Sequence, residues 1–216
     1  MDRFFDNNNP VMRFLSRVVD LAIVNILTVI AMIPVITAGP ALAALNNVLI
    51  HLVRKDETYV WKMYRQSLRQ NMKQGILLGL LFLAAGVLIV GELLVLRSID
   101  SRASTALMIM ITVIGVCVFV IGIYTFALQS RFENPVKITL RNALALALGN
   151  PLRSLAMVLI WAVWAVFLWY IHGVALLVYV IYGLSIPAGA CTLLYDPVFR
   201  ALEPDEEDEE DDAEAI

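Results

Sequence analysis

Charged side chains and cysteines are scarce in this chain of 216 residues. Asp, Glu, Lys and Arg make up 16 % of the sequence, against about 25 % in a typical soluble domain. Its two cysteines, Cys117 and Cys191, both lie in apolar runs, so we expect no disulfide framework. Apolar residues reach 60 % and the mean hydropathy is +0.79, more than a soluble domain of this length can bury. This composition excludes an ordinary soluble enzyme and indicates a helical protein embedded in lipid.

The sequence motifs of common catalytic and metal sites are also missing. The chain has no Walker phosphate-binding motif, no Gly-x-Ser-x-Gly, no His-Glu-x-x-His and no Cys-x-x-Cys. Its two histidines, His51 and His172, have no second His or Cys at the spacing of metal ligands. We therefore expect no enzyme activity, no cofactor and no metal site.

Long apolar runs divide the chain into membrane-spanning segments, each of which needs about 20 mostly apolar residues. The run at 155–194 is too long for one span, and His172-Gly173 marks a tight turn inside it. The stretch 41–53 is only about 20 Å long as a helix, so it is either a short crossing or one arm of a re-entrant hairpin. The predicted fold is an all-α, polytopic membrane helix bundle of five to six helices, near 18–36, 41–53, 75–96, 106–128, 155–171 and 174–194.

The positions of Lys and Arg favour six crossings over five, because cationic residues accumulate on the cytoplasmic side of membrane proteins. If 41–53 crosses, 14 Lys and Arg lie inside and 2 outside; if it does not, the best orientation has 11 inside and 5 outside. We therefore predict that both termini are cytoplasmic and that an N-terminal hairpin has its tip, residues 34–40, on the outer side. The turn-forming residues of this tip are Pro34, Thr37, Gly39 and Pro40.

Residues 58–74 have the pattern of an amphipathic helix that lies on the membrane surface. On a helical wheel, an apolar face is followed by an adjacent cationic stripe. The apolar face contains Trp61, Tyr64, Leu68 and Met72, and the stripe contains Lys62, Arg65, Arg69 and Lys73. Such stripes face anionic lipid, so the segment is either a simple anchor or a docking surface for a cytoplasmic partner. We do not expect nucleic-acid binding.

An acidic block closes the chain. Ten of the 19 acidic residues lie in 203–214, whereas residues 1–200 carry 16 Lys and Arg against 9 acidic residues. Blocks of like charge repel themselves and stay disordered, so we predict a membrane domain over 1–202 and a disordered cytoplasmic tail over 203–216. The tail is either simply solvated or in contact with the protein's own basic face or a basic partner.

Three asparagines interrupt the apolar arms of the predicted hairpin. A polar side chain in a membrane span is costly, so each is a candidate ligand or partner contact. Asn25 lies before the tip, and Asn46 and Asn47 lie a similar distance after it. We expect them either to hydrogen-bond across the hairpin or to contact a solute.

Two acidic residues and one further asparagine complete the candidate set. Asp20 lies one turn after Arg17, which favours a local ion pair. Glu92 lies near the end of its span, where it either pairs with Arg97 or contacts a cation or a sugar. Asn71 precedes the 75–96 span.

Gly75-x-x-x-Gly79 opens the 75–96 span. Small residues four positions apart allow two membrane helices to approach closely. This pair therefore predicts a helix-packing site and gives no information about a ligand.

The first 80 residues contain stretches that resemble one family of bacterial membrane proteins. These stretches are Phe4-Phe5-Asp6 through Asn9-Pro10, Arg17-Val18-Val19-Asp20-Leu21 with Asn25, 33–45, and 65–74. In these residues the chain resembles the YesL-like family, integral membrane proteins of unknown function. The shared positions are Asn9, Pro10, Asp20, Asn25, Pro34, Thr37, Gly39, Pro40 and Asn71. The resemblance is weaker in the later spans, and the acidic tail departs from it.

The resemblance implies a place in the bacterial plasma membrane, and no catalytic or binding residue can be carried over from it. Genes of this family often lie beside those of ABC importers for complex carbohydrates. Three functions follow as hypotheses. The first is an accessory protein that contacts a carbohydrate ABC permease, the second a small solute transporter or channel, and the third a membrane chaperone or regulatory adaptor.

Overall fold

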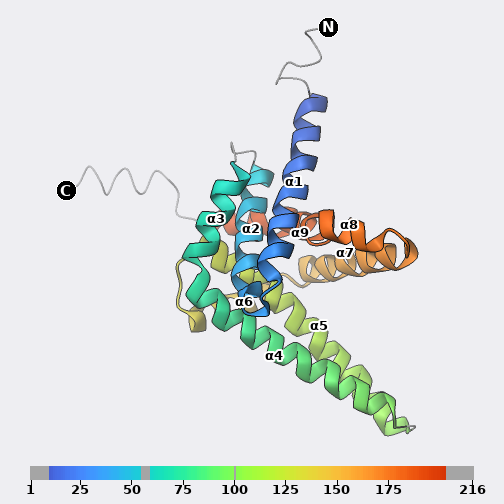
Figure 1. Cartoon of the computed structure of the whole chain (residues 1–216). Helices are drawn as coiled ribbons and strands as arrows, with labels where there is room; N and C mark the ends of the chain where they lie inside the picture. The colour runs from blue at the N-terminus through green and yellow to red at the C-terminus, as the bar shows by residue number, and fades with distance from the viewer. Residues whose placement is uncertain (1–9, 55–58, 100, 203–216) are drawn as a thin grey trace, which may run out of the picture.

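The computed structural model describes residues 10–54, 59–99 and 101–202, and within these ranges the chain is helical with no strand (Figure 1). The predicted all-α fold is confirmed. The predicted tail, 203–216, lies outside the described residues. The helices are α1 (Pro10–Met32), the short 3-10 helix η2 (Val35–Thr37), α2 (Ala38–Arg54), α3 (Val60–Gln70), α4 (Met72–Arg97), α5 (Arg102–Arg131), α6 (Val136–Gly149), α7 (Pro151–Tyr170), α8 (Ala175–Tyr182) and α9 (Ser185–Arg200).

Five helical segments are long and apolar enough to cross a membrane, which confirms the expected five to six spans. They are Phe14–Met32, Val35–Arg54, Met72–Arg97, Arg102–Arg131 and Pro151–Tyr170. The pair α8–α9 makes a sixth if it counts as one span, although it bends by 45° at its break. The predicted span 174–194 is therefore two helices, with the break at Gly183-Leu184.

Helix α2, which contains the short apolar stretch 41–53, is the centre of the molecule. It packs against α1, α3, α4, α5 and α9, and most of its side chains are buried. In contrast, α4, α7 and the first half of α5 expose most of their apolar side chains. In Figure 1, the hairpin α4–α5 and the pair α7–α8 extend away from this centre, and α1 extends in a third direction. The molecule therefore has a compact middle and apolar arms.

Two groups of buried side chains hold this middle together. Around α2, the first group joins Val24 of α1, Leu49 of α2 and Tyr64 of α3. The second, which includes Tyr124 of α5 and Phe199 of α9, joins the end of α5 to α6, α7 and α9. The burial of these large side chains is the main stabilising term for the centre.

The predicted surface helix 58–74 differs from the structure in its bounds and in its apolar face. A break at Asn71 ends α3 and begins α4, and residue 58 is not described. Tyr64 is 4 % exposed and packs toward α1 and α2, whereas Trp61 is 62 % exposed beside the cations. The apolar face of α3 is thus covered by protein except at Trp61. Residues 129–153, counted as a loop in the topology, contain the helix α6.

The N-terminal hairpin turns where expected, since η2 separates α1 from α2. However, Gly39 and Pro40 lie in the first turn of α2 and pack against the start of α4. A Cβ at Gly39 would collide with the backbone of Gly75, and a Cβ at Gly79 would lie 2.9 Å from Gly39. The two backbones therefore touch, as in membrane helix pairs with small residues four apart.

This contact argues against six full crossings and fits the re-entrant form of the predicted hairpin. Six crossings place the tip on the outer face and the start of α4 on the cytoplasmic face, about 30 Å apart across the hydrocarbon core. The structure places the tip residue Gly39 against Gly75 and Gly79, at the beginning of α4. The hairpin tip therefore does not reach the membrane face opposite the start of α4. The charge count could not detect this, because it assigns each loop to a face without knowing which segments touch.

Candidate functional site

The side chain of Asn25 joins α1 to the break between α8 and α9. Its Nδ2 donates to the carbonyls of Tyr179 (3.0 Å) and Val180 (2.8 Å), and its Oδ1 accepts from the N–H groups of Leu184 (2.7 Å) and Ser185 (2.8 Å). Three of these four groups are left without a backbone partner by the break between the helices, whereas the Tyr179 carbonyl also accepts from the Gly183 N–H at 2.8 Å. Asn25 is fully buried, and its amide has two donors and two acceptor sites, all of which are used here.

The same break is held from α7. Trp164 Nε1 donates to the carbonyl of Gly183 at 2.9 Å. A Cβ at Gly183 would lie within 2.5 Å of the Tyr179 ring, so a larger residue does not fit without movement. The bend between α8 and α9 is thus fixed from two other helices.

Asn46 belongs to a second polar cluster, between α2 and α9. Tyr195 donates its hydroxyl proton to Asn46 Oδ1 at 2.8 Å, and Thr192 Oγ1 lies 2.9 Å from the same hydroxyl. Asn46 Nδ2 donates to the carbonyl of Leu42 one turn earlier at 2.8 Å. Asn25 and Asn46 therefore contact different partners, so the expected bond across the hairpin does not form between them. Asn47, one residue on, is half-buried.

A buried ion cluster joins the ends of α2 and α9. Asp196 Oδ1 accepts from Arg54 Nε at 2.7 Å, and its Oδ2 accepts from Arg200 Nε at 2.8 Å. The side chain of Asp196 is 4 % exposed and that of Arg54 is 12 % exposed, whereas that of Arg200 is 56 % exposed. The pair Arg54–Asp196 is therefore the buried contact, and it sets the position of α9 on α2.

The remaining polar candidates lie apart from these clusters. Asp20 is half-buried and within the field of Arg17, but the Arg17 guanidinium donates to the Leu52 carbonyl at 2.6 Å. Glu92 is exposed on α4, and the structure does not bring it within ion-pair distance of Arg97.

The side chains of Asn71 and Thr37 hydrogen-bond to nearby backbone carbonyls. Asn71 Nδ2 donates to the Ser67 carbonyl at 2.9 Å, and the Asn71 carbonyl accepts from Gln129 of α5. Thr37 Oγ1 lies 2.8 Å from the Pro34 carbonyl and so closes the hairpin tip. These residues shape the turns that they occupy.

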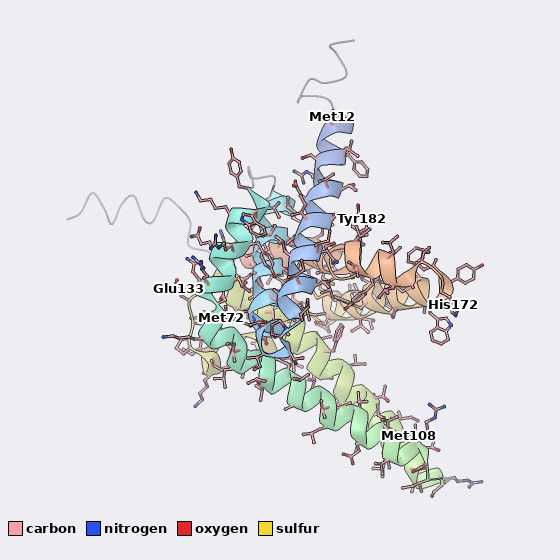
Figure 2. The ribbon with its side chains drawn as sticks, in the orientation of Figure 1. Met12, Met72, Met108, Glu133, His172 and Tyr182 are labelled. Atoms are coloured by element: carbon pink, nitrogen blue, oxygen red, sulfur yellow. The ribbon has the colours of Figure 1, made fainter. Side chains whose placement is uncertain are left out.

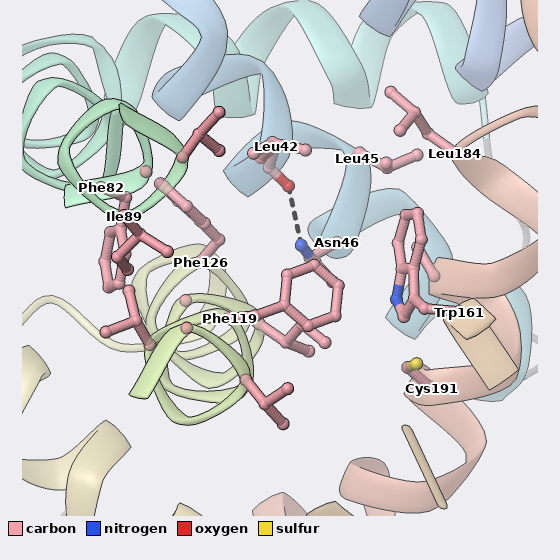
Figure 3. A pocket seen from close by; sticks show the side chains of 18 of the residues that line it. Leu42, Leu45, Asn46, Phe82, Ile89, Phe119, Phe126, Trp161, Leu184 and Cys191 are labelled. Carbon is pink, nitrogen blue, oxygen red and sulfur yellow. Dashed lines mark hydrogen bonds between the residues drawn. The ribbon is translucent and has the colours of Figure 1, made fainter. Parts of the chain in front are cut away.

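A groove of about 630 Å³ opens between the hairpin α4–α5 and the pair α7–α9 (Figure 3). Its inner end is formed by α2, where Leu42, Leu45 and Asn46 face it, and Trp161 and Cys191 form the wall opposite Phe119. Almost the whole lining is apolar, and Asn46 already has partners within the fold. The groove therefore suits an apolar occupant and offers no charged group to a solute.

The cationic stripe of α3 and the start of α4 lies on the opposite side of α3 from α2. Its four members are Lys62, Arg65, Arg69 and Lys73, and all four are exposed. In Figure 2, nitrogen-bearing side chains project outward from α3, whereas the arms α4 and α5 carry mainly carbon. The stripe is the main charged surface of this part of the described chain.

Sequence reasoning missed the partners in α9. Asp196 follows the predicted span 174–194 directly and has the position of a surface residue, while Tyr195 and Thr192 are ordinary in an apolar helix. A carboxylate one turn from Arg200, close to a span, was the one available signal. Within the described residues, no group of three His, Cys, Asp or Glu side chains could hold a metal ion.

One part of the chain is similar to a known family. Residues 21–93, from the middle of α1 to near the end of α4, match the model of a family described as protein of unknown function, DUF624. No curated protein and no solved structure matches the chain. The matched region includes Asn25, the Gly39–Gly75 contact and the cationic stripe, so the family likeness covers the N-terminal half of the compact centre and leaves its function open.

Proposed function

We propose that this chain is an accessory membrane protein that binds another membrane protein and transports no solute itself. The observation that carries the proposal is the saturation of its buried amides. Asn25 makes four hydrogen bonds within the fold, and Asn46 bonds to Tyr195 and Leu42. A solute path would need such groups free to exchange partners, and here they hold helices together.

The partner that we propose is the permease of a bacterial carbohydrate ABC importer. The support is the resemblance of the first 80 residues to the YesL-like family, together with the match of residues 21–93 to DUF624, to which YesL-like proteins belong. Neither the apolar arms nor the buried clusters offer a binding site for a sugar. In this proposal the permease, and not this chain, selects the sugar.

The groove between α4–α5 and α7–α9 is the contact surface that we propose for a permease helix. It lies among apolar segments long enough to cross the bilayer. Gly86 lines it, and a Cβ at Gly86 would meet nothing within 4 Å. A small residue at an open position lets a second helix approach closely.

We further propose that α4 begins at the cytoplasmic face of the bacterial plasma membrane, with the hairpin tip and Leu202 on the same side. Lys73, Arg131 and Arg153 lie at the near ends of α4, α5 and α7, together with the cations of α3. The far end of the α4–α5 hairpin carries Arg97 and Arg102. The excess of cations at the near ends favours this orientation.

Purification of the tagged protein from its native membrane in mild detergent tests the proposal, with bound proteins identified by mass spectrometry. We expect permease subunits to co-purify, and we expect Gly86→Trp to remove most of them. Gly91→Trp is the matched control, because Gly91 is also open on α4 but does not line the groove.

Two results would contradict the proposal. If the protein purifies without bound subunits, the accessory function is rejected. Solute flux through vesicles that contain only this protein would favour a transporter instead. Equal yields of permease with Gly86→Trp and Gly91→Trp would show that the permease does not bind in the groove.

A further inference from the structure

The cationic stripe has no partner within the described residues. Lys62, Arg65, Arg69 and Lys73 are exposed, and no described carboxylate lies within ion-pair distance of any of them. Their spacing of three and four residues places them on one side of α3 and the first turn of α4. No acidic residue occurs in α3, so the stripe is an uncompensated surface of four positive charges.

The described chain ends close to the α4 end of this stripe. Leu202 and Asn134 line one small pocket. The Asn134 carbonyl accepts from Gln74 Nε2 at 2.8 Å, and Gln74 directly follows Lys73 in the sequence. The segment that continues from Leu202 therefore begins within a few side-chain lengths of Lys73.

That segment has the length and charge to cover the stripe. Residues 203–214 contain ten acidic residues and no cation. Twelve extended residues span at most about 40 Å, whereas α3, with 11 residues, is about 16 Å long. The segment can thus run the whole length of α3, and its charge exceeds that of the stripe.

We propose that the acidic segment 203–214 lies along the cationic stripe of α3 and neutralises it. Two observations favour the chain's own segment over the membrane surface. Most of the apolar face of α3 packs on α1 and α2, and Trp61 is the one member of that face left exposed beside the cations, so this helix has little apolar surface to insert into lipid. A tethered segment also acts at an effective concentration in the millimolar range. A separate acidic partner of similar affinity would need a higher concentration to displace it.

A second, smaller basic surface lies on α6. Lys137 and Arg141 are exposed there, and Asn142 lines the same small pocket as Leu202. This surface has two cations against four on the stripe, so the segment favours the stripe. Lys137 is therefore an internal reference for contacts that arise from proximity alone.

Zero-length carbodiimide cross-linking of the full-length protein in phosphatidylcholine nanodiscs tests the proposal, because it joins carboxylates to amines in contact. We expect Lys62 and Lys73 to link to residues 203–214 within one molecule, several-fold more than Lys137 does. Salt at about 1 M, where the Debye length is about 3 Å, should remove these links. The double variant Arg65→Gln/Arg69→Gln should lower their yield several-fold, and Arg97→Gln/Arg102→Gln should leave it unchanged.

Three results would overturn the proposal. The first is a yield at Lys137 equal to that at Lys62 and Lys73, which would indicate unspecific proximity. The second is cross-linking only between two molecules. The third is loss of the links in nanodiscs that contain phosphatidylglycerol, which would assign the stripe to anionic lipid. None of these outcomes bears on co-purification of the permease, so the two proposals fail separately.

Discussion

A single amide decides how the last two helices meet the first. Asn25 bonds to four backbone groups of α8, α9 and the break between them, 154–160 positions later in the chain. Three of these bonds satisfy groups that the helix break would otherwise leave buried without a partner, and the fourth is a second bond to the Tyr179 carbonyl, which also accepts from Gly183. The function of this residue is therefore structural, and replacing it should lower the free energy of unfolding.

Asn25→Leu should lower the free energy of unfolding by about 2 kcal/mol or more, because membrane hydrogen bonds average about 0.6 kcal/mol each and four are lost. Asn25→Asp should also be destabilising, because it keeps an acceptor for Leu184 and Ser185 but turns its second oxygen toward the carbonyls of Tyr179 and Val180. Unfolding in mixed detergent micelles measures both. Asn47→Leu is the control. An equal loss of unfolding free energy in Asn47→Leu would contradict a special structural function of Asn25.

The absence of a side chain at Gly39 is the second residue-scale requirement. Gly39→Ala places a Cβ against the backbone of Gly75, and overpacking of this kind costs about 1–3 kcal/mol. We expect a lower melting temperature in detergent for Gly39→Ala. Gly91→Ala, with open space around its Cβ, should leave the melting temperature unchanged or raise it, since Ala favours helix. Equal melting temperatures for the two variants would contradict the contact.

At the residue scale, the sequence predicts which side chains are unusual but not what they contact. Asn25 and Asn46 stand out because apolar runs surround them, and Gly75 and Gly79 stand out by their spacing. Their partners lie in distant segments, so no local pattern contains them. Asp196 was missed because its position after a span is typical of the surface, whereas tertiary packing buries it.

At the scale of elements, the ion pair between Arg54 and Asp196 fixes α9 on the end of α2. Burial makes the pair sensitive to the loss of one partner, because the remaining charge is left desolvated. Arg200 also contacts Asp196 but is more than half exposed, and exposed ion pairs contribute little. Loss of Arg54 should therefore lower the free energy of unfolding more than loss of Arg200.

Asp196→Asn should destabilise the protein by about 3 kcal/mol, the lower range for a broken buried pair, whereas Arg200→Gln should cost under about 1 kcal/mol. The double variant Arg54→Gln/Asp196→Asn should lose less than the two single variants together, because the residues share one contact. Denaturant unfolding of the unchanged protein, the double variant and the single variants Asp196→Asn, Arg54→Gln and Arg200→Gln measures these losses. Additive losses, or equal losses for the two arginines, would argue against the buried pair as the main link.

Apolar run length predicts the number of helices that can span a membrane, and the structure confirms five to six. It does not predict where helices break. The segment 58–74 reads as one amphipathic helix, but Asn71 bonds back to Ser67 and divides it. The span 174–194 also breaks, because Asn25 and Trp164 satisfy the backbone groups that the break releases. Such compensation comes from other elements and is invisible to a local window.

At the scale of the whole molecule, the arms and the centre differ in what they expose. The far part of the hairpin α4–α5 exposes apolar side chains, whereas α2 is enclosed by five other helices. A helix that is buried on all sides and one that faces lipid have the same apolar composition. Length and hydropathy qualify both α2 and α4 as candidate spans, and their contacts show that α2 is enclosed and α4 is exposed.

The position of the hairpin tip decides most directly between the predicted six crossings and the arrangement in the structure. In a Cys117→Ser background, where Cys191 is buried, single cysteines at Ile36, Lys73 and Ser98 can be labelled with a membrane-impermeant thiol reagent. We expect Ser98→Cys to react in intact cells, and Ile36→Cys and Lys73→Cys to react only after permeabilisation. Reaction of Ile36→Cys from outside, with Lys73→Cys protected, would place the tip on the far face and contradict the contact between Gly39 and Gly75.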